Sequence, residues 1–510
     1  MNPHARLVLI FGIAVVAALF AGCASVGVDV WERDILAKAE MRPGHNAVDR
    51  ALDDHIYFQQ GSLEWRTGLW WRRVRMQLKR AEPIRATLTA FTAALLGTSV
   101  GARAADPGKV DSSLLIYNEV NRVSAVEGVI DLTRPVSDRR TYSLRLTLDA
   151  LTGASPNGAT PSSHVQSFTG ASGTVGFTAP AGTIPLDNTF SDRRLGVDGT
   201  LIESLDRLTV FTVGGHLSFE RDYSSLGVNG GITRDVNRRN TTLGISGSYS
   251  HDTVSPIGGA PTPLSSMPAP TPSTGGEGEG EGEGGGGGGP GQGKDIEGII
   301  ASLSQVLGRQ TLLAANYSFE HSSGYLTDPY KLLSVVQDET SATPGEPADY
   351  LYENRPGGRS MQALYGELRR YIAGVTADVS YRYFWDDWGI TSHAVDVLTR
   401  VPVTHGHALE PHVRWYRQSA ADFYQTYLVQ GDQVPQFASA DSRLAAFDAW
   451  TYGLKYSLPV HENDALGFSA EYYTQKGTRG PPNPIGILGQ YDLFPALDVF
   501  MFRVGFSHGF

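Results

Sequence analysis

The chain has 510 residues, of which 59 are Gly and 10% are aromatic, and it carries a formal net charge of −11. An acidic chain lacks the basic footprint of a nucleic-acid-binding protein, and a single Cys excludes both an intramolecular disulfide and a Cys-based zinc cluster. Abundant Gly and aromatic residues with only 19% charged residues fit a large β-protein. A membrane barrel has this composition because only alternate residues of each strand face lipid.

The amino terminus has the pattern of a secretory signal over residues 1–22. His4 and Arg6 precede an apolar run at 7–20, and two small residues then precede Cys23. This pattern resembles the lipobox of bacterial lipoproteins, which implies that Cys23 is lipidated. An ordinary signal peptide followed by an incidental Cys is the alternative.

A second export signal is predicted inside the chain, at residues 76–104. Met76 opens a basic stretch, residues 86–100 are apolar or small, and Ala102-Arg103-Ala104 has the form of a cleavage site. The alternative is one short apolar helix. With two such signals, the chain looks like two exported proteins joined in one reading frame, either by true fusion or by the assignment of the start.

The segment between the two signals, residues 23–75, is expected to be short and mostly irregular or helical. Its stretches at 31–34 (WERD), 36–38 (LAK) and 51–58 (ALDDHIYF) resemble domain-of-unknown-function family 4266, a family of very short bacterial lipoproteins. Forty residues cannot bury much core alone, so we expect this segment to lie along a partner or to stay mobile.

Residues 105–510 show strand after strand with period-two alternation, for example near 191–203 and 296–307. In 375–385 the odd positions, such as Val379 and Tyr381, are apolar or aromatic, and most even positions are polar. We predict an all-β fold, a transmembrane antiparallel β-barrel of about 16 strands (14–16). A soluble barrel would show the reverse arrangement, but the export signals and the aromatic strand ends favour lipid outside.

Connection lengths support a barrel with long extracellular loops. The long connections all follow odd-numbered strands, and every connection after an even-numbered strand is short, as in bacterial barrels. The long connections are 151–190, 254–295, 321–359, 418–446 and 475–496. The connection 254–295 is rich in Pro and Gly, and we expect it to be a disordered outer loop.

Charged residues on the polar strand faces are expected to line the lumen. They are Asp378, Arg382, Glu410, His412 and Arg414. Charges of both signs indicate either a salt-bridged plug or a wet pore that filters ions, and the sequence leaves both open. We expect no catalytic residue, no cofactor and no metal site, because no lipase, phosphate-loop, zinc-protease or c-type haem motif is present.

The carboxyl-terminal strand alternates to an aromatic last residue, with Phe502, Val504, Phe506 and Phe510 on one face. Such an ending resembles the recognition signal of the outer-membrane barrel assembly machinery. This resemblance implies that the machinery and outer-membrane lipid are partners of the chain.

Six longer motifs then point to one family. They are 154–159 (ASPNGA), 226–231 (LGVNGG), 239–242 (RNTT), 323–331 (SGYLTDPYK), 383–389 (YFWDDWG) and 417–424 (RQSAADFY). Together they resemble domain-of-unknown-function family 3570, predicted outer-membrane barrels of Gram-negative bacteria, over residues 106–510. The family has no established activity. Its members often sit beside the short lipoprotein gene, which implies a working association of lipoprotein and barrel.

Two functions remain open at this point. The first is a porin-like channel for a small solute or ion, because sixteen strands can leave an aqueous lumen. The second is a non-conducting barrel that anchors or sheathes a periplasmic redox or export partner. We rank the channel first. Inward-folded loops and paired lumen charges would lower that rank.

Overall fold

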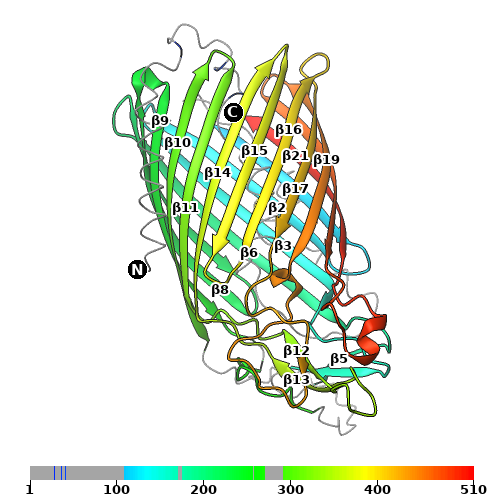
Figure 1. Cartoon of the computed structure of the whole chain (residues 1–510). Helices are drawn as coiled ribbons and strands as arrows, with labels where there is room; N and C mark the ends of the chain where they lie inside the picture. Colours follow the sequence, from blue (N-terminus) through cyan, green and yellow to red (C-terminus); the bar gives the residue numbers. More distant parts are fainter. Residues whose placement is uncertain are drawn as a thin grey trace, which may run out of the picture.

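The computed structural model describes residues 108–170, 175–256, 258–269 and 291–510, together with Val28, Leu36 and Met41. Within these residues the chain forms one closed antiparallel barrel of sixteen strands (Figure 1). The predicted fold class and strand number are confirmed. The two predicted export signals and Cys23 lie outside the described residues.

Each barrel strand pairs with its neighbours in chain order, and the last strand pairs with the first. The barrel strands are β1 (Lys109–Glu119), β2 (Ser124–Ser137), β3 (Arg140–Pro156), β6 (Leu186–Ser204), β7 (Thr209–Phe219), β8 (Tyr223–Val236), β9 (Thr241–Val254), β10 (Gln292–Gly308), β11 (Thr311–Gly324), β14 (Gly358–Ile372), β15 (Val375–Asp386), β16 (Thr391–Pro402), β17 (Ala408–Gln418), β19 (Phe447–His461), β20 (Asp464–Gly477) and β21 (Leu497–Gly509).

The alternation of the sequence becomes the two faces of the barrel wall. On β7 the apolar side chains of Val213, Leu217 and Phe219 are 39%, 40% and 53% exposed, on the outside of the barrel. The alternate residues Gly214, His216 and Ser218 face the lumen, because successive side chains of a strand point to opposite faces. Exposed apolar side chains recur around the whole barrel, which is the expected surface of a wall that faces lipid.

The two ends of the barrel differ. At one end every connection is a tight turn, such as Ala373-Gly374, where both residues have positive φ (49° and 97°) and match the strand twist. All five long connections emerge at the other end, as their parity in the sequence predicts. We therefore assign the tight-turn end as periplasmic and the long-connection end as extracellular.

The long connections contain five short strands that sequence patterns did not predict. They are β4 (Gln166–Thr169), β5 (Val175–Ala179), β12 (Leu332–Val336), β13 (Pro347–Tyr352) and β18 (Leu428–Val429). The strand β12 pairs antiparallel with β13 and parallel with β18, and β4 pairs with β5. Figure 1 shows β5, β12 and β13 gathered at one end of the barrel. We call the described parts of these five connections the cap.

The expectation of disorder over 254–295 is wrong for part of that range. The strand β10 already begins at Gln292, and residues 258–269 pack in the cap. The backbone N–H groups of Leu264 and Met267 donate to the carbonyl oxygens of Tyr352 (3.1 Å) and Tyr350 (2.7 Å). Both apolar side chains pack against buried cap residues, which anchors a Pro-rich segment that composition alone predicts to be loose. Residues 271–290 lie outside the described part.

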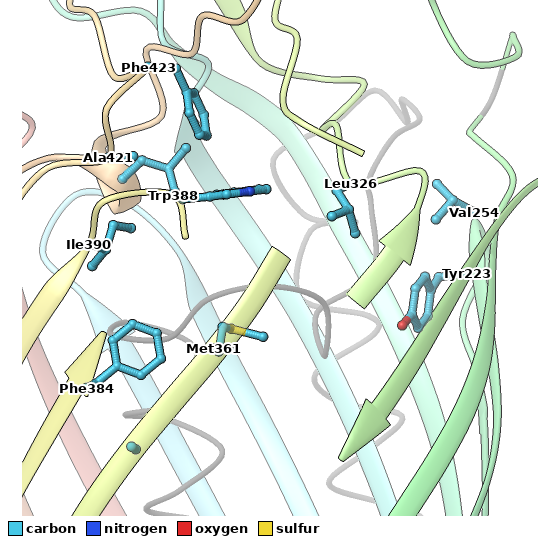
Figure 2. Packing of buried hydrophobic residues seen from close by; sticks show 11 residues of the cluster. Tyr223, Val254, Leu326, Met361, Phe384, Trp388, Ile390, Ala421 and Phe423 are labelled. Atoms are coloured by element: carbon cyan, nitrogen blue, oxygen red, sulfur yellow. The ribbon is translucent and has the colours of Figure 1, made fainter. Parts of the chain in front are cut away.

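The main apolar cluster sits at the extracellular mouth, where the cap meets the inner face of the strands. Figure 2 shows its side chains reaching from both sides of the mouth, with Tyr223 and Val254 on one side and Phe384 and Ile390 on the other. Between them the rings of Trp388 and Phe423 pack edge to face, 4.9 Å apart. The described residues contain no helix of the length and apolar character needed to cross a membrane.

Candidate functional site: the barrel lumen

The inward-facing positions of the barrel form two walls of different chemistry. From β14 through β21, and on into β1–β6, they carry many Arg, Asp, Glu and His side chains, and we call this the charged wall. From β7 through β10 they carry mainly Gly, Ser, Thr and Asn, and we call this the small-residue wall. The cross-strand registers fix which positions share the inner face.

Asp378 lies on the inner face of β15, opposite Arg369 of β14. The guanidinium of Arg369 donates from Nε to Asp378 Oδ2 (2.9 Å) and from Nη2 to Glu367 Oε1 (2.8 Å). The side chains of Arg369 and Glu367 are nearly buried, so two carboxylates share one guanidinium in a poorly hydrated place. Such a triad holds three strand positions together through charge-assisted hydrogen bonds.

Glu410 on β17 is 2% exposed and forms an ion pair with Arg400 of β16. On its other side Lys455 of β19 approaches to 4.0 Å. The acid therefore lies between two cations, one from each neighbouring strand.

His412, two residues along β17, bridges two acids. Its Nε2 lies 3.0 Å from Asp396 Oδ1 on β16, and its Nδ1 lies 3.2 Å from Glu471 Oε1 on β20. The second contact spans β19, because the position between them is Gly453, where an added Cβ would meet Glu471 Oε1 at 2.8 Å. Glycine at this site thus allows a hydrogen bond across an intervening strand.

The two remaining predicted lumen residues belong to the same wall. Arg414 lies 3.9 Å from Asp396, so this acid is shared with His412. Arg382 faces inward on β15, opposite Tyr365 of β14 and Ala394 of β16. The structure thus places all five predicted residues on one wall. Four of them are ion-paired with partners that the sequence reading did not name.

The charged wall continues past the closing strand pair. Arg194 of β6 donates from Nε to Asp149 of β3 (2.5 Å) and lies 3.8 Å from Glu127 of β2. Arg145 pairs with Asp131 at 2.7 Å in the same way. Ion pairs across neighbouring strands are therefore the common pattern of this wall.

The small-residue wall leaves the lumen open to solvent. Asn229 of β8 and Ser248 of β9 are register partners on the inner face, and both side chains are exposed although they lie inside the barrel. Their neighbours are glycines: an added Cβ at Gly214 would meet the Asn229 amide at 2.9 Å, and one at Gly298 would meet Ser248 Oγ at 2.7 Å. Larger side chains are thus excluded from a water-exposed strip of wall.

The cap over the mouth is held by a buried ionic network. Glu353 accepts hydrogen bonds from the Asp328 backbone N–H (2.7 Å), from Ser439 Oγ (2.5 Å) and from Arg355 Nη2 (3.2 Å). Arg355 also donates to Asp441 (2.8 Å), and Arg443 joins Asp441 to Asp328. The network ties the connection after β11 to the connection after β17.

Burial and charge shift the two key acids of this network in opposite directions. Burial raises the pKa of Glu353 to about 7, against the opposing effect of Arg355. Burial alone would also raise the pKa of Asp441. The cations of Arg443, Lys331 and Arg355 instead hold it well below its usual range. Asp441 is the fixed anion of the cap, and Glu353 is its titratable member.

Two of the ion pairs could have been predicted from the sequence, because their opposite charges lie at equal distances on either side of a turn. Arg369 and Asp378 are placed symmetrically about the turn Ala373-Gly374, as Arg400 and Glu410 are about the turn 403–407. In an antiparallel hairpin, positions symmetric about a two-residue turn face each other. Opposite charges at such positions predict the pairs once the turn is located.

The residues predicted to form the barrel-assembly signal lie on the last strand, β21, and at the end of the chain. Phe502 is 45% exposed on the outer face of β21, and Val504, Phe506 and Phe510 share its parity. Their recognition by the assembly machinery stays a prediction. Within the described ranges, no group of three or more His, Cys, Asp or Glu side chains is placed to hold a metal ion.

A family comparison now adds to this geometry. The model of a family described as "Protein of unknown function (DUF3570)" matches residues 85–508. The chain belongs to this family. The match covers the barrel except for its last residue, Gly509, and begins inside the predicted second export signal. No curated protein matches the sequence.

Solved structures similar to this chain match it at low sequence identity and with TM-scores below 0.4. The ferric enterobactin receptor PfeA of Pseudomonas aeruginosa is 12% identical with a TM-score of 0.36, covering 74% of this chain and 54% of the receptor, so the chain spans about half the receptor's length. The CymD monoaromatic hydrocarbon channel is 8% identical with a TM-score of 0.34, covering 87% and 95% of the two chains. A bacterial polysaccharide outer membrane secretin is 8% identical with a TM-score of 0.37, covering 80% and 100%.

Proposed function

We propose that the protein is a channel of the Gram-negative outer membrane for a small polar solute or ion, with its extracellular mouth narrowed by the cap. The observation that supports this proposal is the water-exposed small-residue wall, with Asn229 and Ser248 exposed inside a sixteen-strand barrel. Barrels of this size can hold an aqueous lumen. The solute passes along this wall, opposite the ion-paired charged wall.

The solute class follows from the lining. Hydroxyl and amide groups on the small-residue wall can replace water around a polar solute, and paired charges of both signs opposite it leave little net field. We therefore expect weak ion selectivity and passage of small neutral or zwitterionic molecules.

Single-channel conductance of the full chain in a planar bilayer with asymmetric KCl tests this proposal. We expect discrete steps, and a reversal potential near zero, because the lumen charges are paired. Silence from protein with the heat-modifiable mobility of a folded barrel would contradict the channel.

A second candidate is a non-conducting barrel that anchors or sheathes a periplasmic redox or export partner. The inward-folded cap and the paired lumen charges favour it, since both reduce the open path. Silence in the bilayer together with co-purification of a periplasmic protein would support this candidate.

The proposal also includes how the chain is exported and how its amino-terminal segment is held at the membrane. We infer that the amino-terminal segment lies in the periplasm, bound to the membrane through a lipid on Cys23, with barrel assembly directed by the β21 residues ending at Phe510. Intact mass of the chain recovered from outer membranes tests the anchor. A species that begins at lipidated Cys23 supports it, and a species that begins near Ala105 shows that the barrel travels alone.

A further inference from the structure

At the periplasmic end, or rim, of the barrel, one group of buried residues lies beside two tight turns whose own tips are exposed. The buried residues lie around the β8–β9 turn and the β10–β11 hairpin. They are Asn240 (7% exposed), Thr241 (3%), Gln305 (2%), Val306 (9%) and Leu312 (8%). The tips of these two turns, such as Arg238 and Arg309, are exposed, as Arg139 and Gly406 are at other turns of the same end. What distinguishes this place is that Asn240, Val306 and Leu312 contact the amino-terminal segment.

Described residues of the amino-terminal segment make the contact. The backbone N–H of Val28 donates to Asn240 Oδ1 at 3.1 Å in a buried hydrogen bond. The side chain of Val28 is itself buried in one apolar cluster with Val306 and Leu312, and Leu36 packs against the same cluster. A polar and an apolar contact thus meet at one place.

The backbone of the β8–β9 turn has an unusual conformation beside this contact. Asn237, Arg238 and Arg239 all have positive φ (49°, 56° and 65°), a left-handed run that side chains other than Gly rarely adopt and that costs energy. The run places Asn240, whose N–H donates to Asn237 O (2.9 Å) and whose carbonyl accepts from Val306 N–H (2.8 Å). The backbone of Asn240 is therefore fixed, and its side-chain oxygen is presented to Val28.

The side chains next to Asn240 are also held in place by hydrogen bonds. Thr241 Oγ1 donates to Gln305 Oε1 (2.7 Å), and Gln305 Nε2 donates to the carbonyl oxygen of Val306 (2.9 Å). These bonds satisfy buried polar groups beside the apolar pair Val306 and Leu312. Strained backbone that is held by its surroundings is a feature of binding sites.

We propose that this rim is a docking site for the chain's own lipoprotein-like segment, which it holds through the Val28 backbone and the apolar side chains of Val28 and Leu36. Val28 is five residues after Cys23, and five residues span at most ~17 Å. A lipid on Cys23 would therefore stay close to the periplasmic rim, beside the inner leaflet of the outer membrane. The segment acts as a tethered ligand of the barrel at its periplasmic opening, whether or not the barrel conducts.

Cross-linking in the full chain tests the docking. Val28→Cys is combined with Val306→Cys, which leaves Asn240 in place, or with Asn463→Cys in the β19–β20 turn as the matched control, and a protease site is inserted between Gly61 and Ser62. A short bis-maleimide is applied to outer membranes before cleavage. We expect the Val306 pair to stay one species on denaturing gels and the Asn463 pair to separate into two. Equal yields, or no link at Val306 in protein with folded-barrel mobility, would overturn the proposal.

A second pair of variants tests the hydrogen bond itself. With Val28→Cys and Val306→Cys as the reporter pair, Asn240→Ala removes the acceptor, and we expect the cross-link yield to fall several-fold. Asn240→Asp keeps an acceptor oxygen and should restore it. An unchanged yield in Asn240→Ala would mean that the rim does not select this segment.

Discussion

The two walls of the lumen are built from the same kind of strand, but their inward side chains differ in size and in charge. On the charged wall, inward side chains are long and neutralise one another across neighbouring strands, as Arg369 does with Glu367 and Asp378. On the small-residue wall they are short and exposed, as at Ser248. The difference indicates that one wall fills and rigidifies the lumen, while the other keeps space along it.

This comparison predicts that the two walls respond differently to substitution. Truncation on the charged wall should leave a buried charge unpaired, which costs several kcal/mol. Truncation on the small-residue wall removes little, but enlargement there should obstruct the lumen. Each wall therefore responds to a different kind of substitution.

The largest expected effect is that of Arg369→Ala, which leaves Glu367 and Asp378 without their shared cation. We expect the free energy of unfolding to fall by about 3–5 kcal/mol, because removing one partner of a buried ion pair strands the others. Urea unfolding of the refolded chain in lipid vesicles, followed by Trp fluorescence, measures it. Ser248→Ala on the other wall is the control and should change the value by less than about 0.5 kcal/mol. Equal effects of the two substitutions would remove the distinction between the walls.

The cap also contains buried charged groups, and one of them, Glu353, should make the stability of the cap depend on pH. The pKa of Glu353 is raised from its ordinary 4.5 to about 7, so the folded cap binds this proton more tightly than the unfolded cap. Cap stability should fall as pH rises from 4.5 to 7, by an amount on the order of 3 kcal/mol, and level off above. Asp441, with its lowered pKa, contributes stability at these pH values that is lost only in stronger acid.

Hydrogen exchange of residues 325–357, corrected for intrinsic rates and compared with β14–β17 as an internal reference, measures this dependence. Glu353→Gln should remove the fall between pH 4.5 and 7. A slope that persists in this variant would assign the titration to another group.

Gly453→Ala tests how closely the charged wall is packed. Its Cβ would meet Glu471 Oε1 at 2.8 Å and push that acid away from His412. We expect a loss of about 1–3 kcal/mol in the same urea measurement, as for overpacked sites. Gly366→Ala on β14, where nothing lies within 4 Å of the added Cβ, is the matched control. A loss as small as that of the control would show that Glu471 relaxes freely.

The smallest effect concerns the open wall. Asn229→Trp places a large ring in the lumen, and Val228→Trp places the same ring one position away, on the outer face. If the barrel conducts along the small-residue wall, Asn229→Trp should lower single-channel conductance by roughly two-fold, and Val228→Trp should not. Identical conductances in both variants would move the conducting path to another part of the lumen.

The barrel strands could be predicted because their signals are local. Alternation such as that of 375–385 fixes both faces of a strand, and turns such as Ala373-Gly374 fix its ends. The predicted strands near 191–203 and 296–307 are β6 and β10, which run further, to Leu186 and Gln292. The extracellular ends of these strands extend beyond the residues that alternate between apolar and polar, so the alternation does not predict where the strands end.

The cap could not be predicted in the same way. The strands β12 and β18 are short, and their pairing of Val335 with Leu428 joins two different connections. The same holds for His412, whose partners Asp396 and Glu471 lie on other strands. Such contacts depend on the register of the closed barrel, which no local pattern encodes.

The seam that closes the barrel has a consequence for biosynthesis. The strand β1 pairs with β21 along the whole length of β1, and at Ser112 and Phe506 the paired residues are 394 positions apart in the chain. Until the last strand has been exported, β1 keeps a free edge of unpaired N–H and C=O groups, which invites pairing with other chains. Contacts of such long range also form slowly. The edge of β1 therefore stays exposed while the rest of the barrel is exported, and we expect a truncation that removes only β21 to aggregate rather than to form a smaller barrel.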